Sequence, residues 1–243
     1  MRFKDKVAIV TGAANGLGKS TAIKLASEGA KVAIIDIDRE KLEQVSNSIC
    51  AAGGKVLAFV IDISKSVEVK DTVNEVLKKF GHIDILINNA GAGWHNGRPF
   101  KDLQEGEWIL DLNIKGTLYL THAVLDNMVE RKYGKIINVA SIAATSGIPN
   151  LAVYSASKGA MVSFTKSLAM ELGSYNINVN CVSPGLITNE AVAPASNGTF
   201  LGRKGTTEEM ALLIAFLASD DASFITGSDY LIDGGRVLGP KGA

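Results

Sequence analysis

The chain has 243 residues, of which 47% are apolar and 21% are charged, and its formal net charge is zero. This length and apolar content suit one α/β domain with a sizeable core, and they exclude a disordered chain. The balanced charge argues against a nucleic-acid surface that works by bulk positive potential.

The start of the chain predicts no targeting segment. Residues 1–6 are charged and lead directly into a short apolar run, unlike a signal or transit peptide. No apolar run approaches the roughly 20 residues that a membrane helix needs. We therefore expect a cytoplasmic protein without a membrane or nucleic-acid partner.

The cysteines and histidines predict no metal site. Cys50 and Cys181 lie in dissimilar settings without a metal-ligand spacing, and the three histidines form no His-Glu-x-x-His pattern. We expect buried, reduced thiols and no bound metal.

A glycine-rich turn follows the first predicted strand. The run Val7 to Thr11 is apolar without alternation, which predicts a strand buried on both faces of a parallel sheet. Residues 12–18 then place glycines as Gly-x-x-x-Gly-x-Gly before a helical stretch. Such glycines let the backbone approach a pyrophosphate, and the helix N-terminus attracts anions, although glycines also serve plain turns. The context favours dinucleotide binding.

An acid ends the second predicted strand, Lys31 to Asp36. Its distance from Gly18 is close to the roughly 20 residues expected for a ribose-binding carboxylate. A carboxylate accepts hydrogen bonds from ribose hydroxyls and repels a 2′-phosphate, and Ile37 supplies no positive charge. The chemistry therefore favours NAD over NADP. The alternative is a helix N-cap role, for which Asp38 is an equally good residue.

Helical and strand-like stretches alternate through the rest of the chain. We expect helices at about 39–52, 67–80, 107–131, around Tyr154 and at 206–218, and strands at 56–61, 83–87, 135–139, 177–182 and 230–232. This alternation predicts a single doubly wound Rossmann domain over residues 1–243. Its parallel sheet would have about seven strands, helices on both faces, and its ligand at the carboxyl ends of the strands. Residues 186–205 have no clear period and are the most lid-like segment.

Three asparagines stand out in this frame. Asn88 and Asn89 end a strand, where amides can pin a turn beside a flat ligand or only satisfy backbone groups. Asn113 lies inside a predicted helix, where asparagine is a poor choice. Asn113 therefore either faces solvent or uses its amide for a specific contact.

Tyr154 and Lys158 are one helical turn apart and share a face. A nearby cation favours the phenolate and lowers a phenol pKa from about 10, toward the range for proton transfer near neutral pH. Such pairs are also common on solvated helix faces, so the other motifs must decide between the two readings.

Together these residues resemble the short-chain dehydrogenase/reductase family over essentially the whole chain. The resemblance rests on seven motifs in the family's order: Thr11-Gly12-x-x-x-Gly16-x-Gly18, Asp62, Asn88-Asn89-Ala90-Gly91, Asn113, Ser141, Tyr154-x-x-x-Lys158 and Pro184-Gly185.

The resemblance implies four catalytic residues. Tyr154 would be the general acid/base, and Ser141 would hold the substrate oxygen by hydrogen bond. Lys158 would lower the Tyr154 pKa and hold the nicotinamide ribose, while Asn113 would bind a water that relays protons from Lys158.

The resemblance also implies a cofactor site and no metal. Besides Tyr154 and Lys158, the residues expected to bind NAD are Gly12, Asn15, Gly16, Leu17, Gly18, Asp36, Ile37, Asp62, Ile63, Asn89, Ala90, Gly91, Pro184, Gly185, Ile187 and Asn189. One departure is Asn189, which stands where the family usually has a threonine that contacts the carboxamide. Thr188 lies one position earlier, so either residue could make that contact.

The sequence indicates less about the substrate pocket than about the cofactor site. The expected lining residues are Ser141, Ala143, Trp94, His95 and Leu151. Trp94 is either a platform for a ring or a packed loop anchor. His95, Arg98 and Arg203 either grip an anionic group or are separate solvated charges.

Three functions compete. The first is an NAD-dependent dehydrogenase of a secondary alcohol or the corresponding ketone. The second is an NADPH-dependent 3-oxoacyl-thioester reductase, against which Asp36 speaks. The third is a non-catalytic nucleotide-sensing protein, which would not need Asn113, Ser141, Tyr154 and Lys158 together. By resemblance we expect a homo-oligomer, specifically a tetramer.

Overall fold

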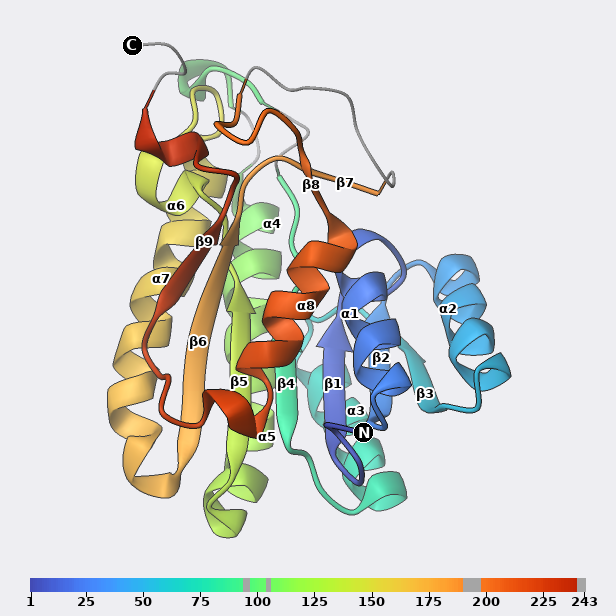
Figure 1. The fold of residues 1–243 in the computed structure, drawn as a ribbon. Coiled ribbons are helices and arrows are strands. Elements are labelled where there is room, and N and C mark those ends of the chain that lie inside the picture. The colour runs from blue at the N-terminus through green and yellow to red at the C-terminus, as the bar shows by residue number, and fades with distance from the viewer. Residues whose placement is uncertain (94–96, 104–105, 190–197, 240–243) are drawn as a thin grey trace.

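The computed structural model describes residues 1–93, 97–103, 106–189 and 198–239. One parallel sheet of seven strands runs through the chain in the order β3-β2-β1-β4-β5-β6-β9 (Figure 1). The strands are β1 (Val7–Thr11), β2 (Lys31–Asp36), β3 (Lys55–Val60), β4 (Ile85–Asn88), β5 (Gly134–Val139), β6 (Ile177–Pro184) and β9 (Asp229–Ile232). The predicted doubly wound sheet is therefore confirmed.

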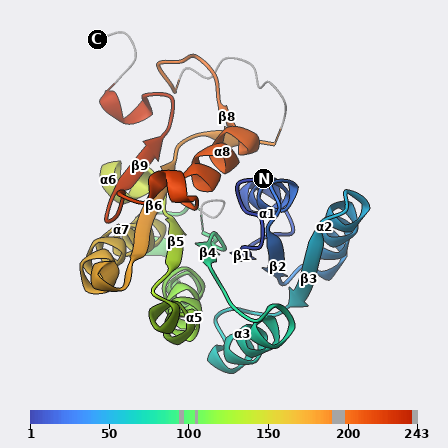
Figure 2. The ribbon, with the colours of Figure 1, turned by 60° about the horizontal axis from the view of Figure 1, so that its bottom comes forward.

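Helices cover both faces of the sheet, as Figure 2 shows. One face carries α1 (Gly16–Ser27), α2 (Arg39–Ala51) and α8 (Thr207–Leu217), and the other carries α3 (Ser66–Phe80), α5 (Thr117–Arg131) and α7 (Ala152–Leu172). Alternate residues of one strand enter the two cores, since Val10 packs on the first face and Ile9 on the second. Because both faces are buried, the strand sequences are apolar without alternation.

The strand order reverses between β1 and β4. The chain moves outward from β1 to β2 and β3, then returns to the other side of β1 at β4. Ligands of open α/β sheets bind at the carboxyl ends of the strands at such a switch point. The glycine-rich turn after β1 and the Asn-Asn-Ala-Gly segment after β4 both lie there.

Two helices differ from the simple periodic pattern. The expected helix at 107–131 is divided into α4 (Glu107–Leu110), a π-helical segment (Asp111–Gly116) and α5. A short helix, α6 (Ala143–Ser146), precedes α7 and was not expected from the sequence. Both departures lie beside residues that the sequence singled out, Asn113 and Ser141.

The expected lid begins and ends in a pair of short strands. In it, β7 (Ile187–Thr188) runs parallel to β8 (Gly205–Thr206). The next helix, α8, starts with a capping box between Thr206 and Glu209. Residues 190–197 of the expected lid lie outside the described residues.

No helix within the described ranges is long and apolar enough to cross a membrane. The expectation of two buried thiols is half wrong, because Cys181 is buried but Cys50 is exposed near the end of α2.

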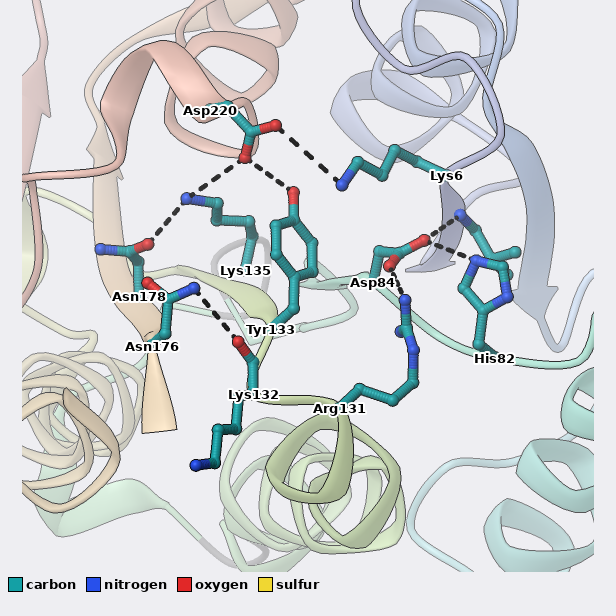
Figure 3. A network of polar contacts seen from close by, with 11 residues as sticks. Lys6, His82, Asp84, Arg131, Lys132, Tyr133, Lys135, Asn176, Asn178 and Asp220 are labelled. Atoms are coloured by element: carbon teal, nitrogen blue, oxygen red, sulfur yellow. Dashed lines mark hydrogen bonds and ion pairs between the residues drawn. The ribbon is translucent and has the colours of Figure 1, made fainter. Parts of the chain in front are cut away.

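A polar network lies at the opposite, amino-terminal edge of the sheet (Figure 3). The buried Asp84 carboxylate accepts hydrogen bonds from the Val7 amide at 2.8 Å and from the Arg131 guanidinium at 2.8 Å. His82 Nε2 lies 3.0 Å from the same carboxylate. Asp84 therefore joins β1, β4 and the end of α5.

We expect Asp84→Asn to lower the free energy of unfolding by about 3 kcal/mol, because breaking a buried pair leaves Arg131 without its counter-charge. Urea unfolding of the two proteins measures the difference. The matched control is Glu43→Gln, which removes the exposed Arg39–Glu43 pair and should cost less than about 0.5 kcal/mol. Equal, small losses in both variants would contradict a structural role for Asp84.

Candidate active site

The glycine-rich turn is held against the segment after β4. A Cβ at Gly18 would overlap the carbonyl oxygen of Gly12, so the start of α1 packs directly on the turn. Gly16 has a φ of +54°, and among the described residues only Asn189 Oδ1 would lie within 4 Å of a Cβ there, at 3.7 Å. Within these residues, the turn leaves open space above the N-terminus of α1.

Asn89 stabilises this turn. Its Nδ2 donates to the carbonyl oxygens of Thr11 at 2.8 Å and Gly12 at 3.2 Å. The Thr11 hydroxyl in turn accepts from the amides of Asn89 and Ala90. Asn88 instead points into the core and donates to Thr121 and Asn138. Asn89 thus holds the ends of β1 and β4 together, whereas Asn88 links β4 to α5 and β5.

Asp36 faces the same turn. Its carboxylate accepts from the Ala14 amide at 3.0 Å and from the Asp38 amide at 3.1 Å. The N-cap of α2 is Asp38, which accepts from the Lys41 amide, so the alternative role for Asp36 is wrong. Ile37 is 74% exposed beside it. Within the described part of the chain, no basic side chain is hydrogen-bonded or ion-paired with Asp36.

Asp62 and Ile63 end the next strand along the edge. The Asp62 carboxylate accepts from the Ser64 amide at 2.9 Å. Ile63 is buried against Gly116 of the π-helical segment, where a Cβ would lie 2.7 Å from its side chain. The Ile63 side chain is therefore part of the core between β3 and the π-helical segment.

Both polar atoms of the Asn113 side-chain amide are hydrogen-bonded. Its Oδ1 accepts from the Ala92 amide at 2.9 Å, and its Nδ2 donates to Ala92 O at 3.0 Å and to Ser157 Oγ at 2.9 Å. The Ser157 hydroxyl donates to the carbonyl of Tyr154 at 2.7 Å. Of the two readings of Asn113, the buried and engaged one is correct. The π-helical turn, a feature often found at functional sites, links the segment after β4 to α7.

Tyr154 and Lys158 are buried together on α7. Lys158 Nζ lies 5.9 Å from the centre of the Tyr154 ring and donates to the Val139 carbonyl at 2.8 Å. Burial lowers the pKa of the Lys158 ammonium to about 8. The Tyr154 phenol is hydrogen-bonded with Ser141, whose hydroxyl also accepts from the Ala143 amide at 3.1 Å.

The sequence predicted a lowered pKa for the Tyr154 phenol, and this direction is wrong for the chain by itself. Burial raises the pKa of the phenol above its ordinary value of 10, and the hydrogen bond with Ser141 offsets this only in part. The physical reason is that the buried phenolate loses hydration. Burial also lowers the pKa of Lys158, so its amine is protonated for less of the time. The phenol therefore keeps its proton near neutral pH.

Gly91 lies against both Lys158 and Asn113. A Cβ at this position would lie 2.9 Å from Lys158 Nζ and 3.1 Å from Asn113 Oδ1. We expect Gly91→Ala to push the Lys158 amine aside and lower kcat at least tenfold. The thermal unfolding midpoint should hardly change, because the end of a lysine side chain can move.

The control for this variant is Gly173→Ala, whose added Cβ meets nothing within 4 Å among the described residues. Steady-state kinetics and a thermal melt of both variants are the measurement. Wild-type kcat in Gly91→Ala would contradict the close packing of Gly91 on Lys158.

The segment after β6 returns over the glycine-rich turn. Pro184 O accepts from the Ile142 amide, and the Gly185 amide donates to Ile232 O, so the end of β6 is tied to its neighbours. Ile187 is half-buried in β7, and Asn189 is exposed with its Oδ1 toward Gly16. Thr188 also makes a polar contact, so whether Thr188 or Asn189 serves a ligand stays open.

A hollow beside Tyr154 is the candidate substrate site. It is lined by Leu151, as expected, and by residues not expected from the sequence, namely Phe100, Leu103, Ile109 and Val153. Arg98 also lines it, whereas Arg203 pairs with Glu209. Ala143 is buried beside Ser141. Trp94 and His95 lie outside the described residues. The missed residues carry no sequence signal beyond being apolar.

The side chains around Tyr154 can donate a proton to a ligand or accept one from it. A buried phenol, a hydroxyl bonded to it and an amine of lowered pKa meet at the carboxyl edge of the sheet, next to an apolar hollow. Beside them, the glycine-rich turn presents the backbone N–H groups of a helix N-terminus.

Comparison with known proteins identifies the family. The family model described as short chain dehydrogenase matches residues 6–198. The chain belongs to this family. Its members are oxidoreductases that use a nicotinamide cofactor, and we regard the chain as an oxidoreductase of this type.

Several short-chain dehydrogenases match over nearly full length. The (2S)-[(R)-hydroxy(phenyl)methyl]succinyl-CoA dehydrogenase subunit BbsD of Thauera aromatica is 40% identical, across 98% of this chain and 99% of that protein. The cyclohexanol dehydrogenase of an Acinetobacter species is 36% identical, across 96% and 95%. The crystal structure of NAD+-bound xylitol dehydrogenase is 34% identical, with a TM-score of 0.89, across 97% and 100%. These relatives act on different alcohols, so the family alone leaves the substrate open.

Proposed function

We propose that this short-chain dehydrogenase transfers a hydride between NAD(H) and a secondary alcohol or its ketone, with Tyr154 as general acid/base. The observation that carries the proposal is the buried group of Ser141, Tyr154 and Lys158 beside an apolar hollow. Asp36 beside the glycine-rich turn supports the choice of NAD.

The residues present fit a nicotinamide dinucleotide. The open space above Gly16 and the N-terminus of α1 suit a pyrophosphate, because backbone N–H groups and the helix dipole favour an anion. Asp36 would hold the ribose hydroxyls, and Asp62 with the Ile63 backbone would meet the adenine. Asn89, Ala90, Gly91, Pro184, Gly185 and the segment from Ile187 to Asn189 would border the remaining part. When bound, the nicotinamide accepts or supplies the hydride.

The chain's own residues handle the proton. In reduction, the Tyr154 hydroxyl would protonate the carbonyl oxygen of the substrate, and in oxidation the phenolate would take the proton of the alcohol. Ser141 would donate a hydrogen bond to that same oxygen and hold it against Tyr154. The raised pKa of the Tyr154 phenol means that the acid form dominates at neutral pH. Oxidation should therefore gain rate as the pH rises.

Lys158 and Asn113 would support Tyr154. The Lys158 amine, with its pKa near 8, can gain and lose a proton at working pH and hold the ribose beside the nicotinamide. Asn113 is hydrogen-bonded with Ala92 and Ser157. It would bind a water that exchanges protons between Lys158 and solvent.

A second candidate is an NADPH-dependent 3-oxoacyl-thioester reductase. Its support is the 37% identity to a 3-oxoacyl-[acyl-carrier-protein] reductase of Thermotoga maritima, across 98% of this chain. The related 3-ketoacyl-(acyl-carrier-protein) reductase of Brucella melitensis, however, was crystallised with NADH, with a TM-score of 0.89. A nucleotide-sensing role has no such support, because the four candidate catalytic residues are all retained.

Fluorescence titration with NADH and NADPH tests the proposal. We expect NADH to bind at least tenfold more tightly. Preference for NADPH would move the oxoacyl reductase to first place.

We also propose a cytoplasmic homotetramer. Its support is a set of large apolar side chains exposed on α7, α8 and the segment near β9, namely Met170, Leu212, Phe216, Phe224 and Leu231. Burying such exposed apolar side chains against a partner subunit would favour association. A gel-filtration mass near 25.6 kDa would contradict the proposal.

A further inference from the structure

The hollow beside Tyr154 combines an apolar wall with one cationic group. Phe100, Leu103, Ile109 and Leu151 supply the wall, and Arg98 is the charged side chain of the lining. A pocket of this kind takes an apolar body, and its few polar groups decide orientation and specificity.

Arg98 differs from the other arginines of the chain. Each of the others has a side-chain contact, and these contacts are Arg2 with Glu28, Arg39 with Glu43, Arg131 with Asp84, Arg203 with Glu209, and Arg236 with Gly198 O. Within the described part of the chain, no carboxylate lies at ion-pair distance from the Arg98 guanidinium. Arg98 is an exposed residue.

The backbone places Arg98 relative to Tyr154. The Arg98 amide donates to the Asn150 carbonyl at 3.0 Å, directly before the start of α7. Pro99 follows, and a turn at Phe100–Asp102 continues the segment. The segment with Arg98 is thus fastened to the end of the helix that carries Tyr154.

We propose that Arg98 binds a carboxylate of the substrate, so that the substrate is a hydroxy acid or oxo acid with an apolar chain. This inference rests on the proposed function, because it assigns the substrate class of the same site. A guanidinium presents a planar pair of donors that matches both oxygens of a carboxylate. The apolar wall would take the hydrocarbon chain while Tyr154 meets the oxygen of the carbinol or carbonyl group.

The experiment compares matched acids and amides. With NAD+ as co-substrate, 3-hydroxyhexanoate and 5-hydroxyhexanoate are each tested against their primary amides. The proteins are wild type, Arg98→Gln, Arg98→Lys and, as a control, Arg39→Gln on α2. The readout is the ratio of kcat/KM for each acid to that for its amide, separated into KM and kcat.

We expect wild type and Arg39→Gln to prefer an acid over its amide by about tenfold or more. Arg98→Gln should lose this preference, mainly through a higher KM for the acid, and Arg98→Lys should keep part of it because lysine lacks the paired donors. Equal ratios in wild type and Arg98→Gln would overturn the proposal and leave the dehydrogenase function standing.

A binding measurement covers the case in which none of these compounds is oxidised, which by itself would count against the proposed function. Hexanoate and hexanamide are titrated into each protein with NADH bound, and the fluorescence of NADH is followed. Hexanoate binding that is at least about tenfold weaker in Arg98→Gln than in Arg39→Gln would support the carboxylate site. Equal binding in the two variants would overturn it.

Discussion

Tyr154→Phe is expected to lower kcat/KM for any accepted secondary alcohol by about 10³-fold, while the affinity for NADH stays within about threefold of wild type. The substitution removes only the hydroxyl that exchanges the proton, and general acid–base catalysis contributes about 10² to 10⁴ in rate. The phenol is buried and bonded with Ser141, so the ring should keep its place. Steady-state oxidation kinetics and a NADH titration measure the two quantities.

The matched control is Tyr175→Phe, which removes an exposed hydroxyl after α7 and should leave the kinetics unchanged. The residual activity of Tyr154→Phe should also lose the rise with pH that wild type shows in oxidation. Full turnover by Tyr154→Phe would show that another group carries the proton.

The combined change Asp36→Ser and Ile37→Arg is expected to shift the ratio of NADPH to NADH affinity by about 10³-fold toward NADPH. Two unit charges 4 Å apart interact by about 4 kcal/mol near a protein surface, which corresponds to about that factor. The change removes a repulsive carboxylate and adds a cation at an exposed position beside it. Fluorescence titration of both nucleotides gives the ratio.

Asp38→Ser is the control for this pair, because Asp38 lies two residues away and caps α2. It should lower stability slightly without changing the preference between nucleotides, since serine is also a good N-cap. If the double change leaves the ratio where it is in wild type, Asp36 does not select the cofactor.

The sequence predicted the parallel sheet well, because strands buried on both faces are apolar without alternation. The apolar runs at Val7 to Thr11 and Lys31 to Asp36 gave the strands at their observed bounds. Asparagine at position 113 predicted either a solvent-facing side chain or an amide with a specific contact, and the structure has that amide bonded to Ala92 and Ser157. The choice between Asp36 and Asp38 as the cap needed the structure, since both residues suit that role chemically.

Electrostatics and the pocket could not be read from the sequence. The helical spacing of Tyr154 and Lys158 gave their shared face, but the direction of the phenol pKa depends on how deeply both groups are buried. The apolar wall of the hollow comes from three separate segments, so residues such as Leu103 and Ile109 lack a common pattern. Arg98 and Arg203 looked alike until the structure showed that only Arg203 has a carboxylate partner among the residues described.

The most direct test of the central claim is to mix the wild-type protein with NAD+ and a panel of secondary alcohols and follow the absorbance of NADH. The panel contains cyclohexanol, butane-2,3-diol, xylitol and 3-hydroxyhexanoate. The proposed function predicts reduction of NAD+ by at least one of them, at a rate about 10³-fold lower for the Tyr154→Phe variant under the same conditions. Tight binding of NADH without reduction of NAD+ by any alcohol, together with no reaction of the corresponding ketones, would contradict it and favour a nucleotide-sensing protein.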